Sequence, residues 1–170
     1  MKLAVIFVVS LLAINSNLIE KSILDGKGTA LLPSDFELMS EEMLRKKYPQ
    51  TSRRPSEVYT DYKAEINVIF DHTRDQVSLE GLESVKDRMV GQFSQIPGMN
   101  LLNHQMRAIN GREFFVVEFI SPALDTEVYN LMFGTSYEGR LLMGTFNCTV
   151  ANRPDWEWVG KKIVNSIELK

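Results

Sequence analysis

The most reactive side chain in this sequence belongs to its only cysteine, Cys148, which lies inside the triplet Asn147-Cys148-Thr149. A thiolate nucleophile needs a nearby cation or helix N-terminus that lowers its pKa, and usually a histidine base. The triplet also fits the acceptor pattern for N-linked glycans, although an asparagine in mid-strand is a poor acceptor compared with one in a loop. Alternation places Cys148 on one face with Phe146 and Val150. This placement predicts a small apolar core residue rather than a nucleophile.

The two histidines are the remaining candidates for acid–base chemistry. His72 lies in the polar run Asp71–Asp75, where an aspartate could orient it as a general base. The run also fits a solvated turn at the exit from a strand, and we favour the turn. His104 lies in an expected strand, which favours a surface residue over a metal ligand. Because neither histidine has a cysteine or histidine neighbour at metal-ligand spacing, the sequence predicts no metal site and no cofactor. A hydrolase built on Cys148 or His72 stays a distant alternative, and we predict no enzyme.

The best candidate for binding is the loop that contains Arg53 and Arg54, the only adjacent arginines in the chain, with Tyr48, Tyr59 and Tyr62 around it. Arginine and tyrosine are enriched at the hot spots of protein interfaces, and a guanidinium group matches the geometry of a carboxylate. The alternative is a solvated loop whose arginines pair with the acidic surface of the same protein. We take these five residues as the predicted contact with a protein partner.

Length and composition are those of one globular domain, with 170 residues, 44% hydrophobic and 24% charged. The net charge of −3 argues against bulk electrostatic binding to nucleic acid. Residues 1–16 consist of Lys2 and an apolar run that is short for a membrane span but suits the core of a signal peptide. The alternative for this run is a buried N-terminal strand.

We therefore expect residues 1–16 to be a signal peptide and residues 23–170 to form a single domain without a stable membrane span. The mature protein would then be exported, either periplasmic or secreted. If the N-terminal run is retained, the protein would instead be cytoplasmic.

Apolar periodicity predicts the elements that position these side chains. A short helix follows the N-cap Ser40, and a half-buried strand alternates over residues 62–70. Residues 79–93 carry apolar side chains at helical spacing. Pro154 opens a last helix, whose buried stripe is formed by Trp156, Val159, Ile163 and Ile167. Between these two helices, the pairs Asn110-Gly111 and Glu138-Gly139 predict two hairpins.

Both faces of the last strand, residues 141–150, are apolar. Helices on both sides of the sheet explain this better than a sandwich of two sheets. The sequence therefore predicts an α+β fold, an α/β/α sandwich around a mostly antiparallel sheet with a hairpin meander.

Several stretches together resemble the DcrB-like branch of the PsbP-like superfamily over roughly residues 23–170: ILDGKGTALLPSDFELMS, KYP with RRPSEVYTD, FFVVEF, and LLMGTFNCTV with GKKIVNSI. The resemblance implies the same α/β/α sandwich. Members of the superfamily include an exported bacterial protein linked to phage uptake, an extrinsic photosystem subunit, a nuclear Ran regulator and adaptors that chaperone secreted effectors. None is known as an enzyme of a defined reaction, so the resemblance implies a role in docking or assembly.

Two functional hypotheses follow. The first is a non-enzymatic exported accessory protein that binds a protein partner through the sheet edge or the arginine–tyrosine loop, and whose role in envelope or secretion processes is unknown. The second is a cytoplasmic adaptor that cradles an apolar helix of a secreted client, which requires that residues 1–16 remain in the mature chain.

Overall fold

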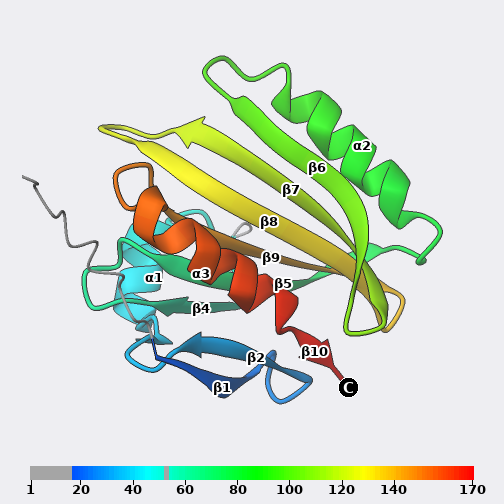
Figure 1. Cartoon of the computed structure of the whole chain (residues 1–170), viewed down its shortest axis with the longest axis horizontal. Coiled ribbons are helices and arrows are strands. Elements are labelled where there is room, and N and C mark those ends of the chain that lie inside the picture. The colour runs from blue at the N-terminus through cyan, green and yellow to red at the C-terminus, as the bar shows by residue number, and fades with distance from the viewer. Residues whose placement is uncertain (1–16, 52–53) are drawn as a thin grey trace, which may run out of the picture.

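The computed structural model describes residues 17–51 and 54–170 (Figure 1). Three helices lie within these residues: α1 (Glu41–Lys47), α2 (Leu82–Phe93) and α3 (Arg153–Asn165). Ten strands accompany them: β1 (Leu18–Ile23), β2 (Gly28–Pro33), β3 (Glu37–Leu38), β4 (Glu57–Thr60), β5 (Asn67–Gln76), β6 (Asn100–Ile109), β7 (Arg112–Pro122), β8 (Glu127–Tyr137), β9 (Arg140–Thr149) and β10 (Glu168–Leu169).

Seven of the strands form one antiparallel sheet in the order β3-β4-β5-β9-β8-β7-β6. Its long strands are joined by the two predicted hairpins, and both are confirmed. Asn110 and Gly111 have φ values of 47° and 79°, and Glu138 and Gly139 have 52° and 73°. Two consecutive residues with positive φ give the turn whose twist matches that of the flanking strands, and asparagine and glycine tolerate it best. The remaining strands form a small sheet in the order β1-β2-β10.

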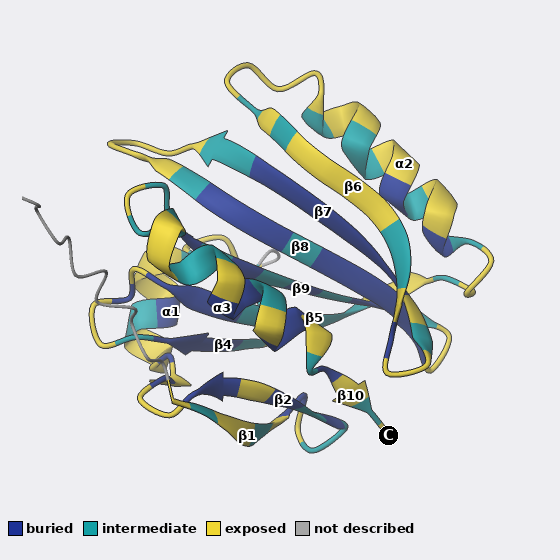
Figure 2. Ribbon diagram, viewed as in Figure 1, coloured by how far each residue is buried: buried dark blue, intermediate teal, exposed yellow. Residues whose placement is uncertain are grey.

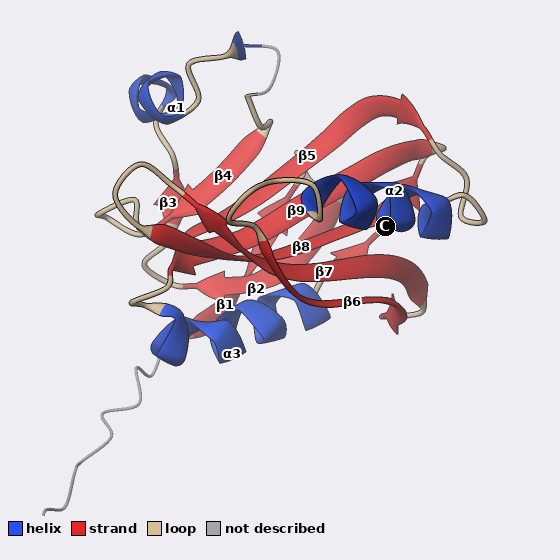
Figure 3. Cartoon of the chain, turned by 90° about the horizontal axis from the view of Figure 1, so that it is seen from above, coloured by secondary structure: helices blue, strands red, loops and turns tan. Residues whose placement is uncertain are grey.

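Helices cover both faces of the large sheet, as the sequence predicts. α3 and the small sheet pack on one face, which we call the α3 face (Figure 1). α1 and α2 lie on the other, the α2 face, with α2 over β6, β7 and β8 (Figure 3). The α/β/α sandwich is therefore confirmed.

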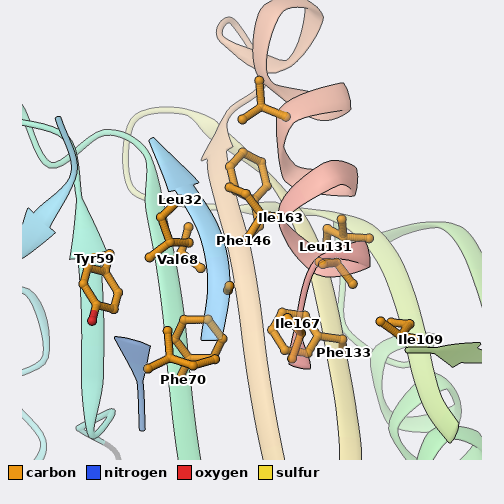
Figure 4. Packing of buried hydrophobic residues seen from close by; sticks show 14 of the residues in the cluster. Leu32, Tyr59, Val68, Phe70, Ile109, Leu131, Phe133, Phe146, Ile163 and Ile167 are labelled. Carbon is orange, nitrogen blue, oxygen red and sulfur yellow. The ribbon is translucent and has the colours of Figure 1, made fainter. Parts of the chain in front are cut away.

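The main core lies on the α3 face, where aromatic and branched side chains from the sheet meet α3 and the small sheet (Figure 4). Phe70, Phe133 and Phe146 are fully buried, and α3 contributes Val159 and Ile163. In Figure 2 the buried residues run along β7 and β8, whereas β6 at the edge is mostly exposed. The stripe of apolar residues predicted for the last helix is thus the surface that anchors it.

Two local predictions around β5 are wrong. The strand begins at Asn67, not at residue 62, because Asp61 closes a turn by accepting hydrogen bonds from Glu65 N and Ile66 N at 2.8 and 2.9 Å. Ala64 within this turn has a φ of 57°. The run Asp71–Asp75 is not a turn, because β5 continues to Gln76 and pairs with β9. Tertiary pairing therefore overrides the local preference of these polar residues.

The small sheet is not among the predicted elements. The predicted domain begins at residue 23, yet β1 begins at Leu18 and pairs with β2 along its whole length. β10 follows α3 directly and pairs with the opposite edge of β2. The predicted signal peptide, residues 1–16, lies outside the described residues.

Candidate protein-docking surface

The middle of the α2 face is not covered by either helix (Figure 3). One row of directly paired residues crosses the sheet there, from Val117 under α2 through Met132, Thr145 and Ile69 to Val58 beside α1. Val117 and Val58 are buried, whereas the three residues between them are only half-buried. We call the uncovered surface the open strip and define it by the following residues: Ile69, Asp71, Met132, Met143, Thr145 and Asn147.

An asparagine ladder crosses the sheet on the same face. Asn130 pairs with Asn147 across β8 and β9, and Asn147 pairs with Asn67 across β9 and β5. The Asn67 amide donates to Asn147 Oδ1 at 2.9 Å and its oxygen accepts from Thr60 Oγ1 at 2.8 Å. Asn130 instead donates to Ser121 Oγ at 3.0 Å and to Val128 O at 2.9 Å. Because each of these amides has hydrogen-bond partners, polar groups can occupy this part of the sheet at little cost. The open strip therefore combines methionine and isoleucine side chains with a polar border.

A hollow of about 490 Å³ extends the open strip along the flank of α2. Val85 and Met89 of α2 form one wall, and Leu141 of β9 lies on the floor. Arg88 and Asp75 place opposite charges on its rim. Apolar walls with a charged rim resemble the central and peripheral parts of a protein interface.

The four predicted contact residues that the structure describes do not form one cluster. Tyr48 follows α1 and packs against the cluster that includes Ile69, and Arg54 Nε donates to Tyr48 O at 3.3 Å. These two residues therefore lie beside the open strip. Tyr62 is 86% exposed on the Asp61 turn. Arg53 lies outside the described residues.

Tyr59 has a different environment from the other three. Its side chain is buried on the α3 face, and its hydroxyl donates to Ser22 O at 2.7 Å. Burial raises the pKa of this phenol far above its ordinary value, and the neighbouring Glu57 adds to the shift. Tyr59 thus fastens β1 to the large sheet, and it presents no surface to a partner.

His72 is held by two hydrogen bonds that define its tautomer. Arg140 Nη2 donates to Nδ1 at 3.2 Å, since a guanidinium group has no acceptor, and Nε2 donates to Tyr137 O at 3.0 Å. Asp71 does not contact this ring in a catalytic pairing, since it lies on the opposite face and accepts from Ser56 Oγ at 2.6 Å. The ring links β5 to the end of the β8–β9 hairpin.

A second cleft, of about 440 Å³, lies between the β1–β2 turn and the large sheet. His72, Glu57 and Tyr59 line it, yet their polar atoms already serve the fold. Glu57 Oε2 accepts from Leu24 N at 2.6 Å and fixes the turn, in which Leu24 and Asp25 have φ values of 55° and 53°. We therefore assign this cleft a structural role.

Cys148 is 1% exposed and lies on the α3 face with Phe146, as predicted. Burial raises the pKa of its thiol to about 12, with smaller and opposite effects from Arg153 and Glu157. The thiolate form is therefore scarce at neutral pH. His104 lies exposed on β6, also as predicted. Among residues 17–51 and 54–170, no three histidine, cysteine or acidic side chains are arranged to hold a metal ion.

Sequence reasoning missed a buried ion-pair network beneath α3. Glu118 is 8% exposed, accepts from the Tyr129 hydroxyl at 3.0 Å and lies 3.4 Å from Lys161 Nζ. Lys161 also pairs with Glu157 at 2.6 Å, and Glu157 pairs with Arg153 at 2.7 Å. The spacing of four residues between Arg153, Glu157 and Lys161 could be recognised in the sequence. Their buried partner Glu118 on β7 could not be predicted from the sequence.

No protein-family model matches this sequence, and no curated protein matches it. Solved structures do match. Cyanobacterial PsbP (CyanoP) from Synechocystis sp. PCC 6803 superposes with a TM-score of 0.63 at 16% identity, covering 91% of this chain and 94% of that one. LpqN of Mycobacterium tuberculosis gives 0.61 at 11% identity, covering 91% and 92%.

The Ran-binding protein Mog1p of Saccharomyces cerevisiae gives a TM-score of 0.58 at 12% identity, covering 91% of this chain and 96% of Mog1p. Together these structures show that the chain has a PsbP-like fold. The finer resemblance to the DcrB-like branch stays a prediction. Within the part of the chain that the structure describes, no helix is long and apolar enough to cross a membrane.

Proposed function

We propose that this PsbP-like protein is a non-enzymatic accessory protein that binds a protein partner on its α2 face. The observation that carries the proposal is the open strip, where Ile69, Met132 and Thr145 lie half-exposed between two helices. A sheet in an α/β/α sandwich normally has both faces covered, so an uncovered middle is a surface that a partner can complete. Methionine side chains adapt to differently shaped partners, which suits such a surface.

The rim of this surface is the loop that follows α1. Arg53 and Arg54 would meet carboxylates of the partner, and Tyr48 would support the loop from below. Tyr62 is exposed enough to contact a partner directly. The fold supports the same kind of role by analogy, since one solved protein of this fold is a Ran-binding protein.

We also propose that the protein is exported and that residues 1–16 are removed. LpqN, which has this fold, is described as involved in cell envelope biogenesis, and this agrees with an envelope location. Intact-mass measurement on protein from native envelope fractions tests the proposal. A mass that lacks about the first sixteen residues supports export, whereas a full-length cytosolic species contradicts it.

A cytoplasmic adaptor is the second candidate, and the methionines of the open strip favour it. An apolar helix of a client could lie between α1 and α2 against Met132 and Met143. This function requires that residues 1–16 stay in the mature chain, so the same mass measurement distinguishes the two candidates.

The docking proposal is tested by crosslinking from defined positions. A photoreactive residue is placed at Thr145 in the open strip, and a matched one at the exposed Glu20 on β1, in protein expressed in the native cells. We expect a single protein adduct from position 145 and none from position 20. Equal adducts from both positions would show that the strip is not the docking surface.

The contribution of the rim is tested separately with the double change Arg53→Glu and Arg54→Glu. The reversed charges should reduce the yield of the same adduct, because they repel the carboxylates that the guanidinium groups meet. The variant should fold normally by circular dichroism, since surface substitutions usually shift stability by within about 0.5 kcal/mol. An unchanged adduct yield would exclude the arginines from the interface.

A further inference from the structure

No strand within the described part of the chain lies beside the outer edge of β6. β6 pairs with β7 on one side only, and no described residue outside this pair hydrogen-bonds the backbone of residues 100–109. In an antiparallel ladder every second residue of an edge strand directs its N–H and C=O groups outward. A ten-residue strand therefore offers a row of free donors and acceptors to an added strand.

This edge carries little of the protection that edge strands usually have. Protected edges are short, contain proline or carry charged side chains such as lysine. β6 has one bulge, at Leu102, and residues 100–106 contain no lysine, arginine, aspartate or glutamate. Leu102 is 38% exposed at the bulge. An uncharged and accessible edge of this length favours pairing with another segment.

A groove beside the edge can receive the side chains of such a segment. A hollow of about 380 Å³ lies between the C-terminal half of α2 and the first part of β6. Val90 of α2 and the C-cap residue Ser94 line it on one side. Leu101, Leu102, Asn103 and His104 of the strand line it on the other, so that apolar and polar side chains share the groove. The exposed Ile96 lies just beyond Ser94. Every second side chain of an added strand would point to the α2 face, where this groove offers an apolar contact.

Arg107 indicates which kind of side chain an added segment would carry on the α3 face, opposite the groove. It is the only arginine, lysine or acid of β6, and it lies on the α3 face, paired with Phe114. Its Nε atom is buried and has no hydrogen-bond partner, and no carboxylate among the described residues forms a salt bridge with it. A buried donor without a partner is uncommon in a native protein. An acidic side chain on an added strand would pair with the guanidinium group of this half-buried arginine.

We propose that the outer edge of β6 binds an extended segment of a partner protein by strand addition, with an apolar residue in the groove beside α2 and an acidic residue that meets Arg107. A second copy of this chain fits less well. β6 contains no aspartate or glutamate, so a self-paired β6 has no carboxylate to offer Arg107. The surface is separate from the open strip, and its test does not depend on what binds there.

The test uses short capped peptides and amide NMR shifts of the whole protein. The probe alternates valine and threonine over about eight residues, the length of an ordinary strand, with one glutamate near its end. The matched probes carry lysine in place of the glutamate, or proline at two central positions. We expect the glutamate probe to shift the amides of residues 100–107 and to bind about fivefold more tightly than the lysine probe, the scale of one favourable ion pair.

Variants of the protein supply the control. Arg107→Glu should reverse the preference between the glutamate and lysine probes, whereas Arg74→Glu, an exposed arginine on β5, should leave it unchanged. The proline probe should not bind, because it lacks the donors that a ladder needs. Equal binding of the two charged probes, or shifts confined to other strands, would overturn the proposal. A dimer in ultracentrifugation that protects the amides of residues 100–109 from exchange, with no peptide binding at β6, would overturn the proposal and assign the edge to a second copy instead.

Discussion

Cys148 and Asn147 are neighbours in β9, and the pleat of the strand directs them to opposite faces. Cys148 packs among phenylalanines on the α3 face, while Asn147 bonds Asn67 on the α2 face. Each environment determines what the side chain can do. The thiol is excluded from water, and the amide oxygen that could have met solvent is occupied by a cross-strand partner.

The Cys148 thiol should be unreactive in the folded protein. Its pKa, raised by burial to about 12, leaves on the order of one thiolate in ten thousand at pH 8. Iodoacetamide at pH 8 should therefore alkylate the native protein slowly and the urea-unfolded protein fully, as intact mass will show. Rapid alkylation of the folded protein would contradict the core position.

The same shift predicts a pH dependence of stability. The unfolded thiol loses its proton near its ordinary pKa of 9, but the folded thiol keeps it until about pH 12. Between these values the unfolded state binds fewer protons, so the free energy of unfolding falls as pH rises. Urea titrations from about pH 8 to 10.5 measure this fall in the free energy of unfolding, and it should be shallower in Cys148→Ala than in the unchanged protein. At pH 7 the same variant should have a free energy of unfolding about 1 kcal/mol lower, because a small buried group is lost. If the free energy of unfolding fell equally with pH in both proteins, the raised pKa of the Cys148 thiol would be contradicted.

At the scale of elements, two helical glycines differ in what surrounds them. A Cβ atom on Gly160 of α3 would lie 2.4 Å from Cδ1 of Phe146, whereas one on Gly91 of α2 would meet nothing within 4 Å. Gly160 therefore allows α3 to approach the sheet closely, and Gly91 has no such role.

Alanine at these two positions should have opposite effects. Gly160→Ala should lower the free energy of unfolding by about 1–3 kcal/mol, because the methyl group pushes α3 away from Phe146. Gly91→Ala should raise it by about 0.5–1 kcal/mol, because alanine favours the helix and reduces the entropy of the unfolded chain. Urea denaturation of both variants measures the difference. If both substitutions changed the free energy of unfolding in the same direction, the close packing of α3 on Phe146 would be contradicted.

At the scale of the whole molecule, the last residues close the small sheet onto the core. β10 pairs with β2, Lys170 N donates to Lys27 O at 3.0 Å, and Leu169 packs against the main core. β2 thus depends on a strand that lies more than a hundred residues away in the sequence. The small sheet is held by contacts that form only in the folded chain.

Deleting residues 168–170 should loosen the small sheet and leave the large one intact. Amide exchange should accelerate in residues 28–33 and stay unchanged in β8, because local opening follows the loss of local contacts. Lys170→Ala, which removes only the side-chain bond to Gly26 O, serves as the control. Acceleration throughout β8 would mean that β10 supports the whole domain rather than one sheet.

Local signals determined most of the elements of this protein. Hairpins at Asn110-Gly111 and Glu138-Gly139, and the helix stripe with Val159 and Ile163, follow from interactions within a few residues. Apolar side chains on both faces of β9 were enough to predict a covered sheet. The wrong predictions lie at residues 62–66 and 71–75, where Asp61 closes a turn and β9 extends a polar strand.

The sequence by itself determined the sandwich, the buried thiol and the acidic character of the chain. Only the tertiary structure decided which surfaces stay open. The open strip joins Ile69 to Thr145, and the edge of β6 is free because no other strand of the described residues reaches it. Such neighbours are set by strand order and register across many residues, and no periodicity within one segment encodes them.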